Sequence, residues 1–309
     1  MAQVRTYVHT MRVAPSPNLN VDKAVKERLK MHREEGMSEV NARETEPLLR
    51  RALERQAKGY EASGVTSLFF SDRVSSVRTF APNLSDDTVA PLYESVGQGV
   101  TVEESAGSGI RIKPGEVLSL FDHVADRVVL GMVDPATYAA PGTRTGASAQ
   151  TLRIQRSQPG RSPQEAVITY EGGRLSAAKA YILYPRKFLT ASYRLAYKNG
   201  KLAEIAVQRY HADGTLIRTE SFVPANQETT APTTPFAAIK VGADVFDFRL
   251  GGDQAVSYKW SGSLPSLDEL RRMETARTDD EPREVNGWIY IAAGAVLVFG
   301  AFLSLRRRR

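Results

Sequence analysis

The sequence predicts an α+β, β-rich fold: a highly curved antiparallel sheet, an unclosed half-barrel, wrapped on two or three amphipathic helices, plus one C-terminal transmembrane helix. Three observations predict it. Apolar residues recur at helical spacing between residues 20 and 60, strand-like alternation begins at residue 65, and residues 288–305 carry no charge. The 309 residues are 42% hydrophobic, which is enough apolar material for a real core.

The N-terminal part is predicted to be a strand followed by two helices. The strand covers residues 4–13 and ends at the breaker formed by residues 15–17. Asn20 can cap the first helix, and the second follows Thr45 with Pro47 in its first turn. We expect both apolar stripes to pack on a sheet, since each lies on one helix face.

A β-meander is predicted from residue 65 onward. Asn199-Gly200 is typical of a two-residue hairpin turn, and residues 212–214 form a loop that ends in glycine, so residues 192–223 should form three antiparallel strands. The other predicted strands are residues 65–70, 74–80, 117–121, 127–133, 151–155, 166–170 and 180–184.

Pairing through those two turns predicts which side chains share a face. It places Ala196 opposite Ala203 and Val207 opposite Thr219. One face then carries five aliphatic residues, which become the candidate lining of a cavity: Ala196, Ala203, Ile205, Val207 and Ile217. The other face, with Tyr193, Leu195 and Tyr197, is expected to be a partly solvated outer surface.

The C-terminal run from Trp288 to Leu305 is predicted to span a membrane. As a helix it would be about 27 Å long, close to the ~30 Å hydrocarbon thickness. Trp288 and Tyr290 would be interfacial anchors, followed by the tail Arg306, Arg307, Arg308 and Arg309. These arginines predict a cytoplasmic C-terminus and an extracytoplasmic, periplasmic domain. The N-terminus shows no signal peptide, so either the signal is missing or the protein is tail-anchored in the cytosol, and we favour the first.

Composition argues against several kinds of chemistry. With zero Cys the chain has no disulfide, thiolate metal site or cysteine nucleophile, and its four histidines lack ligand spacing. Most of the formal charge of +6 comes from the terminal arginines, so nucleic-acid binding is not expected. Its glycine-rich turns and adjacent carboxylates do not form a catalytic motif, so we expect no metal, no cofactor and no enzyme.

Three stretches resemble a known family. They are residues 115–122 followed by Arg127-Val128, the hairpin meander at 193–222, and the strand at 244–248. This order is similar to that of the periplasmic lipoprotein-carrier (LolA/LolB-like, outer-membrane lipoprotein-sorting) superfamily. The resemblance implies a half-barrel with an apolar cavity for acyl chains. It predicts a LolA-like domain at 1–265, a charged juxtamembrane linker at 266–287, the transmembrane helix at 288–305 and a cytoplasmic basic tail at 306–309.

Two functions follow as expectations. The first is a membrane-anchored extracytoplasmic module that binds a lipid, a lipoprotein acyl chain or another apolar ligand without catalysis. The alternative is a membrane-tethered envelope sensor or scaffold that contacts protein partners through the same fold. A filled core with an exposed apolar patch would favour the alternative. A hydrolase built from carboxylates and serines far apart in the sequence is the third class.

Overall fold

The computed structural model describes residues 3–34, 39–82, 88–105, 109–116, 118–134, 149–157, 162–226, 232–251 and 255–280. Its strands are β1 (Gln3–Val13), β2 (Tyr60–Phe70), β3 (Ser75–Pro82), β4 (Val89–Gly97), β5 (Val100–Ser105), β6 (Ile110–Pro114), β7 (Ala149–Arg156), β8 (Gln164–Glu171), β9 (Arg174–Ile182), β10 (Phe188–Lys198), β11 (Lys201–Tyr210), β12 (Leu216–Pro224), β13 (Asp244–Asp247) and β14 (Val256–Lys259).

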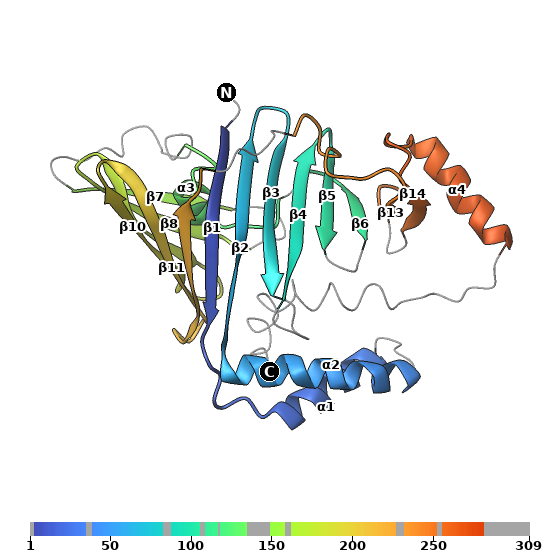
Figure 1. The fold of residues 1–309 in the computed structure, drawn as a ribbon, viewed down its shortest axis with the longest axis horizontal. Coiled ribbons are helices and arrows are strands. Elements are labelled where there is room, and N and C mark those ends of the chain that lie inside the picture. Colours follow the sequence, from blue (N-terminus) through green and yellow to red (C-terminus); the bar gives the residue numbers. More distant parts are fainter. Residues whose placement is uncertain are drawn as a thin grey trace.

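All fourteen strands lie in one sheet, in the order β14-β13-β6-β5-β4-β3-β2-β1-β12-β11-β10-β9-β8-β7. Pairing is antiparallel except between β13 and β6. The order begins at β14 and ends at β7 without closing into a barrel. The prediction of a β-rich, unclosed sheet is therefore confirmed in the described residues. Strand β1 joins two meanders, β2–β6 on one side and β7–β12 on the other (Figure 1).

Helices α1 (Val21–Glu34) and α2 (Glu39–Lys58) pack on each other at one end of the strands (Figure 1). The predicted cap is confirmed, because Asn20 accepts a hydrogen bond from the Lys23 backbone N–H at 3.0 Å. Pro47 lies inside α2 rather than in its first turn. The prediction that the sheet is wrapped on these helices is wrong, since their buried stripes form a cluster of their own, with Val25, Leu29 and Leu53 at its centre.

The main core lies between the curved sheet and the segment 118–134, which contains the short helix α3 (Val124–Val129). The predicted strand at 127–133 is wrong, because Val124, Val128 and Val129 lie on a buried helical face. Residues 118–121 are not a strand either, and Val117 lies outside the described residues. Residues of this segment belong to the same buried cluster as Ile205 and Val207 of β11.

A second core lies on the opposite face, where Trp260 packs with Val102 and Ile112. These residues come from β5, β6 and the C-terminal segment, which ends in helix α4 (Leu267–Asp280). Strands β4, β5, β6 and β14 are absent from the sequence-based expectation. The buried apolar residues of β5 and β6 pack with Val245 and Trp260, which lie more than 130 positions later in the sequence.

The prediction of a membrane anchor needs correction. The four helices found in the described ranges include none that is long and apolar enough to cross a membrane. The transmembrane element of the predicted fold class is therefore wrong for the structure as described, and the single-pass localisation loses its basis. The predicted span 288–305, with Trp288 and Tyr290, and the tail 306–309 lie outside the described residues.

Candidate functional site

The five predicted lining residues do not share one face. Ile205 and Val207 are buried at 0% and 2% exposure, whereas Ala203 and Ile217 are half-buried and Ala196 is exposed. Strand pairing shifts between Ala196 and Tyr197, which places Ala196 opposite Glu204 instead of Ala203. A β-bulge of this kind adds one residue to one strand and reverses the side chains beyond it. The role of the five predicted lining residues in ligand binding stays a prediction.

A second shift, between Arg209 and Tyr210, changes the β11–β12 register. Val207 lies opposite Glu220 rather than Thr219. Tyr193, which we expected outside, is buried instead. The concave face therefore carries charged side chains next to its aliphatic ones.

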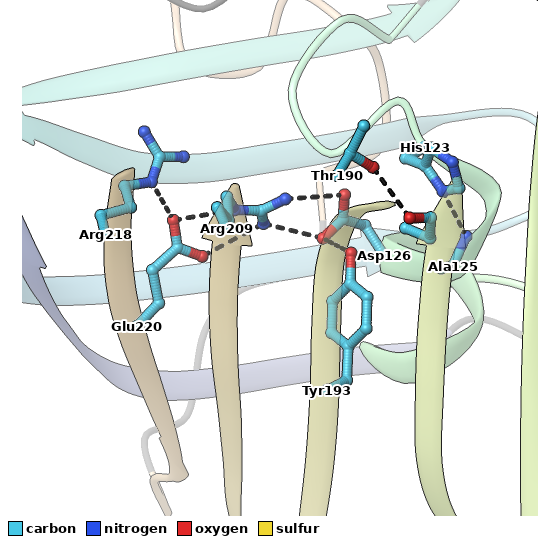
Figure 2. A network of polar contacts seen from close by, with 9 residues as sticks. His123, Ala125, Asp126, Thr190, Tyr193, Arg209, Arg218 and Glu220 are labelled. Atoms are coloured by element: carbon cyan, nitrogen blue, oxygen red, sulfur yellow. Dashed lines mark hydrogen bonds and ion pairs between the residues drawn. The ribbon is translucent and has the colours of Figure 1, made fainter. Parts of the chain in front are cut away.

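Those charged side chains form an ion network, defined here as Asp126, Tyr193, Arg209, Arg218 and Glu220 (Figure 2). The Arg209 guanidinium donates to Asp126 Oδ1 at 2.8 Å and to Glu220 Oε1 at 3.0 Å. Arg218 Nε donates to the same Glu220 oxygen at 2.5 Å. Tyr193 donates to Asp126 Oδ1 at 2.9 Å. The ion network thus ties α3 to strands β10, β11 and β12.

The contacts of Glu220 and Tyr193 within the ion network shift the pKa values of these two side chains. Burial favours the neutral acid at Glu220, but Arg209 and Arg218 outweigh it and hold the pKa of Glu220 well below its usual range. Burial and the Asp126 charge raise the pKa of Tyr193 well above its usual value. A carboxylate and a phenol held in this way do not exchange protons near neutral pH, so the ion network serves to position α3.

His123 begins α3 as its N-cap. Its Nδ1 accepts from the Ala125 backbone N–H at 3.1 Å, and this assigns the ring proton to Nε2, which donates to the Tyr181 carbonyl at 3.1 Å. Burial lowers the pKa of His123. The imidazole is therefore neutral and holds the start of the helix against β9.

Sequence reasoning missed every member of the ion network as a functional group. Arg209 and Asp126 are 83 residues apart, and Asp126 adjoins a predicted strand that is a helix. The sequence signal that could have indicated the ion network is the placement of Arg209 and Glu220 among the alternating apolar residues of the central meander. That signal also fits a solvated outer face, which is how we interpreted it.

Two surface features complete the site. A pocket of about 380 Å³ opens between the loop before β10 and the β11–β12 turn, where Arg186, Lys187 and Tyr210 contribute to its lining. It lies away from Ile205 and Val207 and does not provide the predicted apolar cavity.

The second feature is an exposed row of valines on the central strands. Val8 pairs directly with Val65 on β2 and with Val223 on β12. Val4 is on the same face of β1, four residues from Val8. These four residues, here called the valine patch, are 39% to 44% exposed. Tyr7 and His9 point to the opposite, buried face, where Tyr7 donates to the Leu130 carbonyl at the end of α3.

Comparison with models of known protein families and with curated proteins finds no match for this chain. In the part of the chain that the structure describes, no three His, Asp or Glu side chains are grouped so as to hold a metal ion.

Proposed function

We propose that this protein is a non-enzymatic binding module that contacts a protein partner through the valine patch. The observation that carries the proposal is the exposed row formed by Val223, Val8 and Val65 across three adjacent central strands. The solvated face of an antiparallel sheet normally carries polar side chains. A large contiguous patch of exposed apolar surface marks an interaction site on a folded protein, and Val223, Val8 and Val65 are direct cross-strand neighbours.

The surroundings of the patch suit a dry protein contact. Its immediate neighbours are small hydroxyl residues such as Thr10 and Ser63, whose side chains lie 3.4 Å apart. The charged pair Arg12 and Glu61 lies further along the same strands, toward α1 and α2. An apolar centre with a polar rim is the usual arrangement of a protein interface.

The packing of the main core supports this function over the apolar-ligand alternative. Ile205 and Val207 belong to one buried cluster with the residues of segment 118–134. The ion network crosses the same concave face, and a ligand that entered there would separate paired buried charges. A partner can contact the exposed valines without separating any of these buried charge pairs.

Photo-crosslinking tests the proposal. Benzoylphenylalanine at Val8, in cells that naturally produce the chain, should yield a covalent adduct with a protein, and Val65→Lys should abolish that adduct. The same photo-crosslinker at Ala196, which is exposed on β10, is the position control. With the purified partner, Val65→Lys should weaken binding at least ten-fold, whereas the isosteric Val65→Thr should weaken it less.

Folding must be intact in these variants for the comparison to hold. An exposed strand position usually changes the free energy of unfolding by about 0.5 kcal/mol or less, which denaturant titration can verify. Equal protein adducts from Val8 and Ala196 would contradict the proposal. Adducts with lipid alone would instead support the apolar-ligand function.

A further inference from the structure

The strands that carry the valine patch hold an unusual histidine on their buried face. His9 lies next to Val8 on β1, opposite Phe222 of β12 and opposite Gly64 of β2. The pairing of β1 with β12, called the seam here, joins the two meanders of the sheet. Any change at His9 therefore acts where the two halves of the sheet meet.

The His9 ring contacts uncharged side chains from three strands, namely Phe222, Phe80 and Thr66. It stacks on Phe222 with 4.0 Å between ring centroids, and Phe80 lies 5.0 Å away. Its Nδ1 is 3.0 Å from Thr66 Oγ1, and that hydroxyl is 2.7 Å from Thr79 Oγ1. The side chain is thus held by stacking and by one hydroxyl chain.

The other ring nitrogen of His9 has no such support. Nε2 is buried and has no hydrogen-bond partner among the described residues. An imidazolium has two N–H donors, so protonation would bury a charge and an N–H without an acceptor. The closed seam therefore accommodates only the neutral ring.

We propose that His9 makes the seam acid-sensitive, so that acidification separates β1 from β12 and disrupts the valine patch on the other face. The acid response of the seam needs no partner. Only the consequence for binding rests on the proposed function of the valine patch.

The charged groups around His9 do not remove this sensitivity. From β12, Glu220 favours the imidazolium and Arg218 opposes it, and from β11 Arg209 also opposes it. Glu220 is already paired with both arginines. From β2 and β3 the neighbours Thr66, Thr79 and Phe80 are uncharged.

The direction of the pH dependence follows from linkage. Burial, with the two arginines, lowers the pKa of His9 to about 4, whereas an exposed histidine titrates near 6.5. The stability of the seam is complete above 6.5 and falls as the pH falls toward 4. With these two pKa values, the equilibrium constant for opening of the seam is about 30-fold larger at pH 5 than at pH 8.

Hydrogen exchange of the full chain measures that opening. Protection factors corrected for intrinsic exchange should fall about 30-fold for β1 and β12 amides between pH 8 and pH 5, while β8 and β9 amides change far less. His9→Gln, which cannot titrate, should remove the pH response of the seam. The matched control is His123→Asn, which removes the imidazole at the start of α3 while keeping an N-cap residue.

Two outcomes would overturn the proposal: a seam response that persists in His9→Gln, or one that disappears in His123→Asn. If His9→Gln does not fold, the imidazole titration of His9 in the unchanged protein decides, and a pKa of 6 or above contradicts the proposal. Crosslinking from Val8 at pH 8 tests the proposed function independently. A pH-sensitive seam without any adduct would sustain this inference and reject the function.

Discussion

At the scale of single residues, Gly59 shows how one backbone conformation fixes the junction between α2 and β2. Its φ is +72°, and an added Cβ would lie 2.7 Å from the Val13 carbonyl oxygen and 2.9 Å from the Pro15 nitrogen. Both obstacles are backbone atoms, which cannot move aside as a flexible side chain can. The close approach lets β2 return beside β1 directly after the helix.

Replacing Gly59 by Ala should therefore cost more than the backbone strain alone. The matched control is Gly99→Ala, because Gly99 has a φ of +76° and nothing within 4 Å of its added Cβ. We expect Gly99→Ala to lower the free energy of unfolding by about 1–2 kcal/mol and Gly59→Ala by clearly more. Urea titration of both variants checks this, and equal losses would show that the contact with Val13 and Pro15 has no cost.

At the scale of elements, the ion network decides how α3 is held against the meander. Removing one partner of a buried ion pair leaves an uncompensated charge and costs about 3–5 kcal/mol. Arg209→Met removes the ion pair of Asp126, whose side chain is 5% accessible, whereas Glu220 keeps its pair with Arg218. The variant should be strongly destabilised in thermal or urea unfolding.

The control for Arg209→Met is Arg12→Met, which breaks the exposed pair with Glu61, whose side chains are 72% and 51% accessible. Exposed pairs contribute about 0–1 kcal/mol, so this variant should unfold almost as the parent does. A similar, small loss for both variants would mean that water reaches the ion network and that it does not hold α3.

The same elements show what the sequence could predict and why. The cap at Asn20 was predictable because it depends on a residue three positions away, and the Asn199-Gly200 turn depends on its own dipeptide. The bulge next to Ala196 has no local sequence signature, and Leu195 and Tyr193, which follow it away from the turn, are buried in the core. A register extended from the turn therefore assigned Tyr193 to the wrong face.

The candidate sites illustrate the same limit. The valine patch needs the β1–β2 and β1–β12 pairings, which join residues 57 and 215 positions apart. The helix at 124–129 is short, and its adjacent apolar residues fit a strand equally well in the sequence. The contact of Asp126 with Arg209, which accompanies the helix, is visible only in the folded structure. Local residue spacing could predict the strands of the meander, but it could not predict which strands distant in the sequence pair with each other.

At the scale of the whole molecule, one sheet supports two cores on opposite faces. The first core joins both meanders, because Val77 of β3 and Ile205 of β11 belong to the same buried cluster. The second contains Trp260 and is attached through β5 and β6. Continuous strand pairing between them predicts that the described fold unfolds as one unit.

Ile205→Ala tests this coupling. The side chain is fully buried in the first core, so its truncation should cost about 2–5 kcal/mol. In a Trp288→Phe background Trp260 is the one remaining tryptophan, and its fluorescence reports the second core. If the sheet is one cooperative unit, Ile205→Ala lowers the urea midpoint of Trp260 fluorescence as much as that of far-UV circular dichroism. A fluorescence midpoint unchanged by Ile205→Ala would mean that the Trp260 core unfolds independently and that the sheet is continuous without being cooperative.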